Sequence, residues 1–414
     1  MTDVRQVCQQ LLTQWSRGEQ FAATLIERAC EKHGLQSRDR AFLQTLALGV
    51  LRNLSLLDHW IDHLRDKGAI KPAVRWLLRQ GFYEAIFMRT ADHAGVFQNV
   101  KLARRYEKGL VNALLRRASS EKDSLLAQVE TLPLPLRFSL PPMLIDRWES
   151  RFGHDDTLSL CRRVNEPASV TIRANQLKEE SVAMLEAEFG AIACGAHPGF
   201  FSCPELPRAA IERGLCYVQD PSTAIACYLL DPQPGESVLD ACAAPGGKSG
   251  ILAERMRNSG QLVCVDNRPG RIEMVQGNLS RLGVTSFTTN VHDWLDDKAP
   301  VGLETHSFDR ILIDAPCSNT GVLRRRVDVR WRLTSADVFA AMKETQQQIV
   351  DRSLPFLKPG GTLVYSTCSI EPEENDEVVE WLVYSRGLTL KEQRLNLPHA
   401  DGSDGAFCAA LIKP

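Results

Sequence analysis

Two cysteines each follow a short apolar segment that is typical of a β-strand. The run Arg310 to Ile313 leads into Asp314-Ala315-Pro316-Cys317, and the run Thr362 to Tyr365 leads into Ser366-Thr367-Cys368. The carboxyl ends of parallel strands meet at one edge of a sheet, and that edge is where such folds bind ligands. A single cysteine is more often a buried structural residue. Two at neighbouring strand ends indicate a pair of thiols placed for nucleophilic chemistry.

A glycine-containing turn suited to a ligand follows another predicted strand, 237–241. The glycines allow the backbone to approach a ligand, and the start of the next helix favours negative charge. Asp266 ends the following strand, at the spacing of a carboxylate that binds ribose hydroxyls. The pattern therefore predicts a nucleoside cofactor at the turn Ala243-Ala244-Pro245-Gly246-Gly247-Lys248, with Asp266 on its ribose, and leaves open which cofactor it is. Neither G-x-G-x-x-G nor G-x-x-x-x-G-K-[ST] is present, which disfavours dinucleotides and nucleoside triphosphates.

Asp293 follows a third predicted strand and has two interpretations. Its carboxylate could reach an adenine amino group, or it could cap the turn before Trp294.

Two thiols beside a nucleoside cofactor limit the reactions that the site could catalyse. C5 of cytosine is a poor nucleophile, but a thiolate that adds at C6 makes C5 enamine-like and able to accept a methyl group. One thiol would attack and the other would assist release. The residues alone do not say which of Cys317 and Cys368 has which role.

Strand and helix patterns alternate from Gly235 onward, which predicts a mostly parallel sheet with helices on both faces. Residues 1–130 read as helices, among them Arg40 to Leu57, a helix that begins at Pro72, and Val96 to Arg117 with a break near Gly109. A proline-rich stretch at 131–143 predicts a domain boundary or stiff connector. We expect three parts: an all-α domain at 1–130, a linker and small α+β section at 131–230, and an α/β domain at 231–414.

The net charge of −2 conceals an asymmetry along the chain. Residues 1–130 carry 20 Lys and Arg against 14 Asp and Glu, whereas the remainder carries 29 against 37. This excess indicates a polyanion-binding module, although an ordinary solvated helical face gives the same pattern. The candidate contacts are Lys101, Arg104, Arg105, Lys108, Arg116 and Arg117.

Composition limits the remaining possibilities. The 414 residues, 44% of them hydrophobic, suffice for several cores, and we expect neither a signal peptide nor a membrane span. The twelve cysteines are scattered without C-x-x-C, so we expect no disulfide framework, no metal site and a reduced cytoplasmic setting. His59 and His63 have the spacing of metal ligands but lack a third ligand.

The catalytic motifs together resemble a known family. Asp240-Ala241-Cys242-Ala243-Ala244-Pro245-Gly246-Gly247-Lys248, Asp314-Ala315-Pro316-Cys317-Ser318 and Ser366-Thr367-Cys368-Ser369 with Pro372-Glu373-Glu374-Asn375 resemble the S-adenosylmethionine-dependent RNA cytosine-5 methyltransferases of the NOL1/NOP2/Sun family. The helical segment with Val111-Asn112-Ala113-Leu114-Leu115-Arg116 looks like a NusB-type RNA-binding domain. This combination resembles the bacterial branch of the family that modifies small-subunit (16S) rRNA.

The resemblance implies roles that the residues alone leave open. It implies a Rossmann-like methyltransferase domain, with Cys368 as the nucleophile on C6 and Cys317 as the cysteine that aids product release. It implies S-adenosylmethionine contacts from the Cys242–Lys248 loop, Asp266, Asp293 and Asp314. It further implies that Asp314 hydrogen-bonds the cytosine edge and that Lys248 reaches the base pocket. The expected partner is small-subunit rRNA, free or in an early assembly intermediate, bound by a monomer.

The sequence departs from the family's pattern after the Cys317 loop. The usual arginine–arginine–histidine–proline run appears as Arg324-Arg325-Arg326-Val327, and Asn319 stands where a smaller residue is common. Arg324, Arg325 and Arg326 are further candidate RNA contacts. Three rival functions remain: a tRNA cytosine-5 methyltransferase, a nicotinamide-dependent oxidoreductase on the same fold, and a non-catalytic RNA-binding factor.

Overall fold

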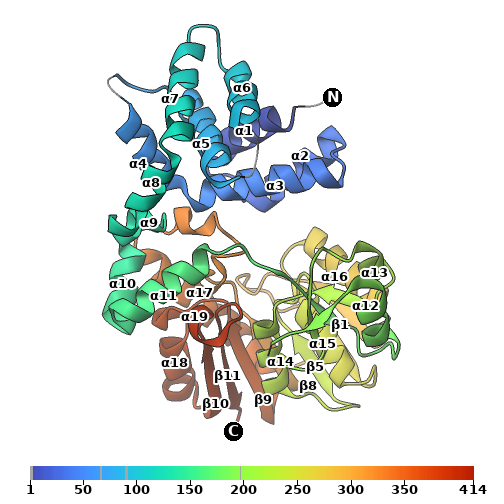
Figure 1. Ribbon diagram of the computed structural model, residues 1–414. Coiled ribbons are helices and arrows are strands. Elements are labelled where there is room, and N and C mark those ends of the chain that lie inside the picture. The colour runs from blue at the N-terminus through green and yellow to red at the C-terminus, as the bar shows by residue number, and fades with distance from the viewer. Residues whose placement is uncertain (1–2, 66–67, 89–91, 196) are drawn as a thin grey trace. The chain divides into compact units, whose positions relative to one another are not determined.

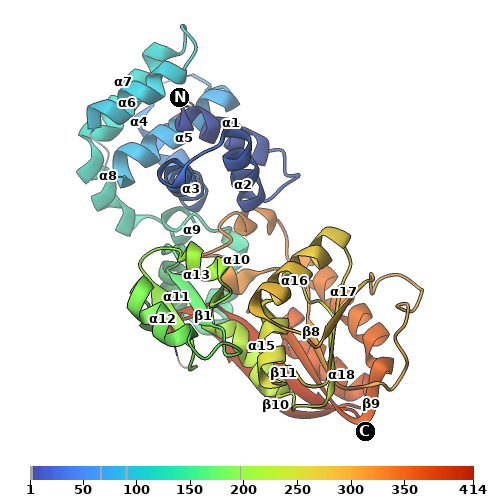
Figure 2. The same ribbon diagram turned by 90° about the vertical axis from the view of Figure 1, so that its right-hand side faces the viewer.

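The computed structural model describes residues 3–65, 68–88, 92–195 and 197–414, and it divides into two compact units. The N-terminal unit comprises Met1–Glu166 together with Arg325–Thr334. The C-terminal unit comprises Pro167–Arg324 together with Ser335–Pro414. All strands of the described residues belong to the C-terminal unit (Figures 1 and 2). The expected all-α and α/β parts are therefore present.

Helix α5 (Pro72–Phe87) lies at the centre of the N-terminal unit. It contacts α1, α3, α4, α6 and α7, and its buried side chains include Trp76 and Phe82 (Figure 1). Pro72 occupies the first turn, as its fixed φ favours and as the sequence predicts. The other helices of this unit are α1 (Val4–Trp15), α2 (Ala22–His33), α3 (Ser37–Arg52), α4 (Leu54–Leu64), α6 (Asp92–Leu102), α7 (Lys108–Ser120), α8 (Lys122–Gln128), η1 (Val129–Thr131), α9 (Leu134–Arg137), α10 (Pro142–Phe152), α11 (His154–Asn165) and η4 (Val329–Arg332).

Two helix boundaries differ from those predicted. The expected helix Arg40 to Leu57 is interrupted at Asn53, whose side-chain amide donates to the carbonyl of Gly49 at 2.9 Å. Such a local bond competes with the helical ladder, and the chain restarts as α4. The expected break at Gly109 falls earlier, in a turn where the Glu107 amide donates to the Arg104 carbonyl at 2.8 Å. Gly109 lies inside α7.

The segment Arg325–Thr334 is part of the N-terminal unit although it is far away in sequence. Val327 is fully buried in the hydrophobic core of this unit, so its side chain has a packing role. This unit continues through α10 and α11 to Glu166. In the proline-rich stretch 131–143, which the sequence predicts as a domain boundary or stiff connector, the prolines lie at the starts of α9 and α10.

The C-terminal unit is built on a seven-stranded sheet of order β10-β11-β9-β8-β5-β6-β7. Strands β5 to β9 pair in parallel, whereas β11 pairs antiparallel with both β9 and β10. Chain order reverses between β5 and β8, which makes a switch point at their carboxyl ends. The strands are β5 (Ser237–Asp240), β6 (Gln261–Asp266), β7 (Phe287–Val291), β8 (Phe308–Asp314), β9 (Leu357–Thr367), β10 (Thr389–Asn396) and β11 (Ala406–Ile412).

Helices cover both faces of this sheet, as the alternation predicts (Figures 1 and 2). Alternating strand residues divide between two cores, because successive side chains point to opposite faces. Leu239, Ile311 and Leu363 pack with α17 and α18, whereas Val238, Leu312 and Val364 pack with α14, α15 and α16. These helices are α14 (Ala224–Leu230), α15 (Gly247–Arg255), α16 (Pro269–Leu282), α17 (Asp337–Ser353) and α18 (Asp376–Arg386), with short turns η2 (Pro221–Thr223), η3 (Thr320–Val322), η5 (Leu354–Phe356), η6 (Pro372–Glu374) and α19 (Pro398–Asp401).

A smaller antiparallel sheet, of order β2-β3-β1-β4, precedes the large one. The sequence pattern predicts a strand at 169–174, a helix at 179–189 and a strand at 216–218, which correspond to β1 (Val170–Ala174), α12 (Ser181–Phe189) and β4 (Cys216–Val218). It does not predict β2 (Ile192–Ala193), β3 (Phe200–Cys203) or α13 (Arg208–Glu212). The buried Arg173 on β1 forms an ion pair with Glu254 of α15 and donates to Gln219 at 2.9 Å. This pair joins the small sheet to the helix that follows the glycine loop.

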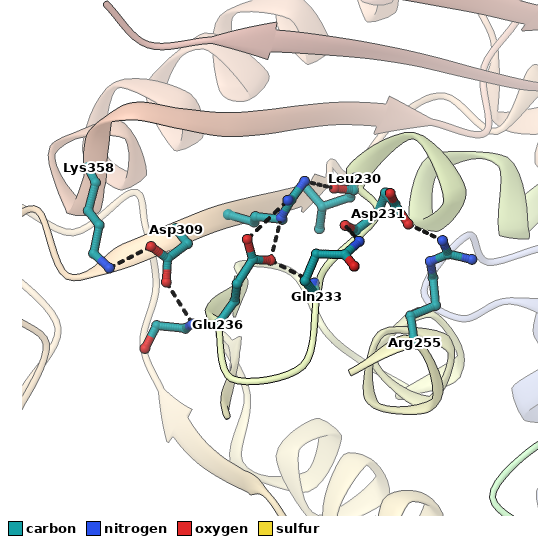
Figure 3. A network of polar contacts seen from close by, with 9 residues as sticks. Leu230, Asp231, Gln233, Glu236, Arg255, Asp309 and Lys358 are labelled. Atoms are coloured by element: carbon teal, nitrogen blue, oxygen red, sulfur yellow. Dashed lines mark hydrogen bonds and ion pairs between the residues drawn. The ribbon is translucent and has the colours of Figure 1, made fainter. Parts of the chain in front are cut away.

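A polar network closes the edge of the large sheet opposite the cysteines, where β5 and β8 begin (Figure 3). Glu236 accepts from the guanidinium of Arg310 and, at 2.7 Å, from the backbone amide of Gln233. Asp309 accepts from Lys358 at 2.6 Å and from the backbone amide of Ser237 at 2.9 Å. These contacts tie three neighbouring strands together at their starts.

Candidate active site

The two cysteines of the predicted pair lie side by side. Strands β8 and β9 are parallel neighbours with Asp314 opposite Ser366, so the loops that follow them leave the same sheet edge. The sulfur of Cys317 lies 3.1 Å from the sulfur of Cys368, and both side chains are partly exposed. The predicted convergence of the two thiols is present in the structure.

Asn319 connects the two cysteine loops. It adopts the left-handed conformation with φ of 62°, which asparagine tolerates better than most residues. Its side-chain amide donates to the carbonyl of Cys317 at 2.6 Å, and its Oδ1 accepts from the thiol of Cys368 at 3.3 Å. This residue therefore contributes directly to the geometry of the pair.

The buried carboxylate of Glu374 holds the two cysteine loops in place. Glu374 accepts from the backbone amide of Ser318 at 2.8 Å, from the Ser318 hydroxyl, and from the Ser369 hydroxyl at 2.6 Å. Ser318 and Ser369 directly follow the two cysteines. Gln346 on α17 donates to Glu374 at 3.2 Å and to the carbonyl of Pro316 at 3.0 Å. Burial raises the pKa of Glu374, and the hydrogen bonds from the two serines oppose that shift.

Asn375 holds the turn after Cys368 in a similar way. Its Oδ1 accepts from the Thr367 hydroxyl at 2.6 Å, and its amide donates to the Ser369 carbonyl at 2.9 Å. The amide of Gly321 donates to the Cys368 carbonyl at 3.0 Å. A methyl group on Gly321 would lie 2.8 Å from that oxygen, so glycine is required for this close approach.

The Cys317 thiol is kept protonated by its surroundings. The hydrogen bond with Cys368, and then burial, raise the pKa of Cys317 well above its ordinary value. A thiol that retains its proton can donate a hydrogen bond to a neighbouring thiolate. The sequence alone does not reveal this environment of Cys317.

Lys248 and Asp314 form an ion pair at the same sheet edge. The Lys248 ammonium lies 2.6 Å from Oδ2 of Asp314, which ends β8. Burial alone would lower the pKa of Lys248, but Asp314 outweighs it and the pKa is raised; Cys368 is among the groups that contribute to the rise. The positive charge of Lys248 therefore interacts with Cys368 as well as with Asp314.

The predicted glycine loop turns sharply between β5 and α15. The Gly246 amide donates to the Ala243 carbonyl at 2.7 Å, and Gly246 has a φ of 100°, which favours glycine. The peptide bond between Ala244 and Pro245 is cis. Gly247 begins α15, so the amides of the first turn point out of the loop. Burial raises the pKa of Cys242 in this loop, so its thiol stays protonated.

Asp266 and Asp293, the two other carboxylates predicted to bind the cofactor, have different surroundings. Asp266 ends β6 beside the loop, accepts from the Ala244 amide at 3.2 Å and pairs with Arg271 at 3.0 Å. Asp293 accepts from the Leu295 amide at 3.0 Å and from the Asn267 side chain at 3.2 Å. The capping interpretation of Asp293 is thus realised in the structure.

Asp240 is the last residue of β5. The sequence predicts its position at the strand end but not the burial or the pKa of its carboxyl group. Asp240 is fully buried and accepts from the Ser249 hydroxyl at 2.7 Å. Burial, and to a smaller extent the charge of Asp314, raise the pKa of Asp240 to about 7.

The candidate RNA contacts have mixed surroundings. Lys101, Arg104, Arg105, Lys108, Arg116 and Arg326 are exposed, and Arg325 is half-buried. Arg117 donates to the Leu64 carbonyl and to Glu121, which is a structural role. Arg324 does not fit the expectation of a surface RNA contact. It is buried and pairs with the buried Asp404 at 3.6 Å, so its guanidinium does not lie on the surface.

In residues 3–65, 68–88, 92–195 and 197–414, no group of three or more His, Cys, Asp or Glu side chains is placed to hold a metal ion. Within that same part of the chain, no helix has the length and apolar character needed to cross a bilayer. All twelve cysteines are free thiols.

Comparison with family models gives two matches that together span most of the chain. Residues 227–412 match the model of the 16S rRNA methyltransferase RsmB/F, and residues 2–120 match the NusB family. Both domains agree with the resemblance drawn from the sequence motifs.

Full-length relatives agree with these models. A probable ribosomal RNA small subunit methyltransferase B from Synechocystis is 33% identical over 100% of both chains. The ribosomal RNA small subunit methyltransferase B of Cronobacter sakazakii is 33% identical, over 95% of this chain and 98% of that protein.

Solved structures agree in fold. The structure of PH0851 covers 99% of this chain and 98% of its own, with a TM-score of 0.78 and 24% identity. A methyltransferase homologue from Pyrococcus horikoshii covers 69% of this chain and 99% of its own, with a TM-score of 0.60 and 28% identity. These likenesses confirm the predicted Rossmann-like methyltransferase fold, and the sequence identities confirm the predicted family: the chain belongs to the ribosomal RNA small subunit methyltransferases B, with a NusB domain ahead of the methyltransferase domain.

Proposed function

We propose that the protein transfers a methyl group from S-adenosylmethionine to C5 of a cytidine in small-subunit (16S) rRNA. The observation that carries the proposal is the pair of thiols, 3.1 Å apart, at the ends of β8 and β9. The ion pair of Lys248 and Asp314 at the same edge supplies polar groups for a base. In this proposal the setting is cytoplasmic and reduced, the enzyme is a monomer, and the rRNA is free or in an early assembly intermediate.

The residues around the glycine loop fit a nucleoside cofactor. The carboxylate of Asp266 lies beside the Ala244 amide at the end of β6, where it could accept from ribose hydroxyls. The nine-residue helix α15 begins at Gly247 and favours negative charge such as the cofactor's carboxylate. Asp293 and the Cys242–Lys248 loop complete the proposed contacts. The bound cofactor would supply an electrophilic methyl group.

Cys368 is the proposed nucleophile. Its thiolate adds to C6 of the cytosine, and this addition makes C5 able to attack the methyl group. The Lys248 charge and a hydrogen bond from the Cys317 thiol would stabilise the thiolate. Asp314 would bind the amino edge of the cytosine, and the target base must leave its stack to reach these groups.

Cys317 is the proposed residue for product release. After methyl transfer, a base removes the C5 proton, the C6–sulfur bond breaks, and the electron pair returns to the Cys368 sulfur. Cys317 lies within reach of that sulfur and holds a proton that it can donate or share. Its loss would leave the covalent adduct with no route to breakdown.

Two cysteine variants test this proposal. Cys368→Ala should abolish transfer of labelled methyl to small-subunit rRNA while leaving S-adenosylmethionine binding intact. Cys317→Ala should accumulate a covalent enzyme–RNA adduct, seen as a slow band on a denaturing gel. Cys408→Ala, a buried cysteine on β11, is the matched control. Product formation by Cys368→Ala would refute the nucleophile assignment.

The substrate is tested by digestion of the labelled RNA to nucleosides. Labelled 5-methylcytidine from rRNA, with none from tRNA assayed in parallel, is the expected result. Label in tRNA alone would keep the chemistry and change the substrate. Thermal stabilisation by NAD but not by S-adenosylhomocysteine would favour the oxidoreductase alternative.

A further inference from the structure

Two exposed aromatic rings of the N-terminal unit lie on α6 and in the turn between α6 and α7. Phe97 is 56% exposed and Tyr106 is 65% exposed. Lys101 lies 4.2 Å from the centre of the Phe97 ring, and Lys71 lies 4.9 Å from the centre of the Tyr106 ring. Each ring therefore presents a face beside a cation, an arrangement worth little for stability at an exposed site.

A hollow of about 780 Å³ adjoins Phe97 between the two helices. Val96, Phe97 and Val100 of α6 line it with apolar atoms, and Asn112, Arg116 and Ser119 of α7 line it with polar atoms. Arg116 donates to the Asn112 Oδ1 at 3.2 Å, which holds the guanidinium at the rim. An apolar lining with a few polar groups suits a planar ligand that also carries hydrogen-bonding edges.

Cations outnumber anions around this hollow, although Glu107 and Glu121 lie nearby. Lys101, Arg104, Arg105, Lys108 and Arg116 are all exposed on or between the two helices. We call this surface, with Phe97 and Tyr106, the α6–α7 face. Phosphate groups satisfy the cations, whereas the ring faces and the hollow require a base that is not paired in a duplex. A basic path with interspersed aromatic rings is how single strands are bound.

We propose that the α6–α7 face binds an unpaired stretch of the RNA substrate, with one base stacked on Phe97 at the hollow and another on Tyr106. This inference rests on the proposed function for the identity of the RNA. It adds to that function a site for single-stranded nucleotides outside the methyltransferase domain, with stacking rather than charge as the source of its preference for unpaired RNA.

The test is binding of a fluorescein-labelled single-stranded RNA oligonucleotide, and of the same strand in a duplex, to the full chain without methyl donor. Phe97→Ala and Tyr106→Ala should each weaken single-strand binding by about tenfold, with little change for the duplex and an unchanged salt dependence. Phe97→Trp should retain the affinity. Arg105→Ala should weaken both RNAs and reduce the salt slope by about one. Tyr384→Ala, an 85% exposed tyrosine on α18, is the control and should change nothing.

Wild-type affinity of Phe97→Ala and Tyr106→Ala for the single strand would overturn the proposal, as would equal losses for strand and duplex. Loss of a protein partner by these variants, with RNA binding unchanged, would make the face a protein-docking surface instead. Because binding is measured without methyl transfer, this outcome is independent of the cysteine tests. A wild-type protein that binds the strand through Phe97 but methylates no RNA would contradict the proposed function alone.

Discussion

The ammonium of Lys248 lies 2.6 Å from the carboxylate of Asp314, and the two residues come from the start of α15 and the end of β8. The pair thus bridges the glycine loop and the Cys317 loop. Lys248 is largely buried and Asp314 is one-third exposed, so each charge depends on the other for solvation. The two candidate subsites, for cofactor and for base, share this contact.

The two charges should contribute to stability as a coupled pair. Asp314→Asn leaves a buried ammonium without its counter-charge and should lower the free energy of unfolding by about 2–3 kcal/mol. Lys248→Met should cost a similar amount, whereas the double variant should recover about 1–2 kcal/mol of the summed loss. Equilibrium urea unfolding of the four proteins gives this coupling. Additive single losses would mean that the contact does not contribute to stability.

Glu374 should act as a positioning residue for the two thiols. Glu374→Ala removes the acceptor for Ser318 and Ser369 and leaves these groups without their buried partner, at a cost of about 2–3 kcal/mol. Glu374→Gln keeps one carbonyl for the Ser318 amide, and its amide can donate to the serine hydroxyls. We expect methyl transfer to fall mainly in kcat for the alanine variant and to recover with glutamine.

Oxidation of the thiols gives a second readout of Glu374. The oxidant diamide removes two hydrogens from a pair of adjacent thiols and joins their sulfurs, so its rate reports how often the sulfurs meet. Formation of the Cys317–Cys368 disulfide should slow several-fold in Glu374→Ala and stay near the wild-type rate in Glu374→Gln. Glu373→Ala changes the neighbouring residue and serves as the control. Equal rates in all four proteins would assign Glu374 a purely structural role.

Asp240 should make the stability depend on pH. Its folded-state pKa of about 7 lies above the unfolded value of about 3.9, so the folded state binds the extra proton between these limits. Stability from this group is therefore complete below pH 4 and is lost as the pH rises through 7. Asp240→Asn keeps an acceptor for Ser249 but cannot ionise. Its stability relative to wild type should increase from pH 4 to 8 by about 4 kcal/mol, because the two pKa values differ by about three units.

Urea midpoints of the two proteins at several pH values measure this difference, because the other titrating groups cancel in the comparison. A difference that stays constant from pH 4 to 8 would show that Asp240 is ionised throughout.

The sequence predicts those parts of the site that depend on the order of residues along strands. The segments before Cys317 and Cys368 have the apolar composition of buried parallel strands, and the geometry of such strands brings their ends together. The glycine turn and Asp266 are predicted for the same reason. The roles of Cys317 and Cys368 are not separable at this level, because the burial and the hydrogen bond that act on Cys317 depend on tertiary contacts that the sequence does not show.

What the sequence does not predict depends on contacts between distant residues. Gln346 lies on a helix face and has no local signal, yet it binds both Glu374 and the Pro316 carbonyl. Arg324 resembles its basic neighbours in sequence, and tertiary contacts such as that with Asp404 remove it from the surface. The segment 325–334 has no pattern that assigns it to the N-terminal unit. A buried arginine holds it there.

Arg330 is the residue whose loss should release this segment. It is fully buried in the N-terminal unit and donates to Asn165 Oδ1 at 2.8 Å and to the carbonyls of Phe138, Val164 and Ser139 at 3.2–3.3 Å. Burial, and then the charge of Arg52, lower the pKa of Arg330. Its charge is thus solvated by carbonyl and amide oxygens that the planar guanidinium reaches in several directions.

Arg330→Met would leave these oxygens without their donor and should destabilise the packing of 325–334 against α9 and α11 by about 3 kcal/mol. Arg330→Lys should restore only part of this, since an ammonium cannot reproduce the fork of donors. Amide hydrogen exchange in peptides from 134–165 and 325–334 should rise by about a hundredfold in the methionine variant, because that factor corresponds to about 3 kcal/mol. Arg326→Met, an exposed arginine on the same segment, should leave exchange unchanged. Unchanged exchange in Arg330→Met would mean that Val327 and the hydrogen bonds of Trp331 and Asp328 hold the segment without the arginine.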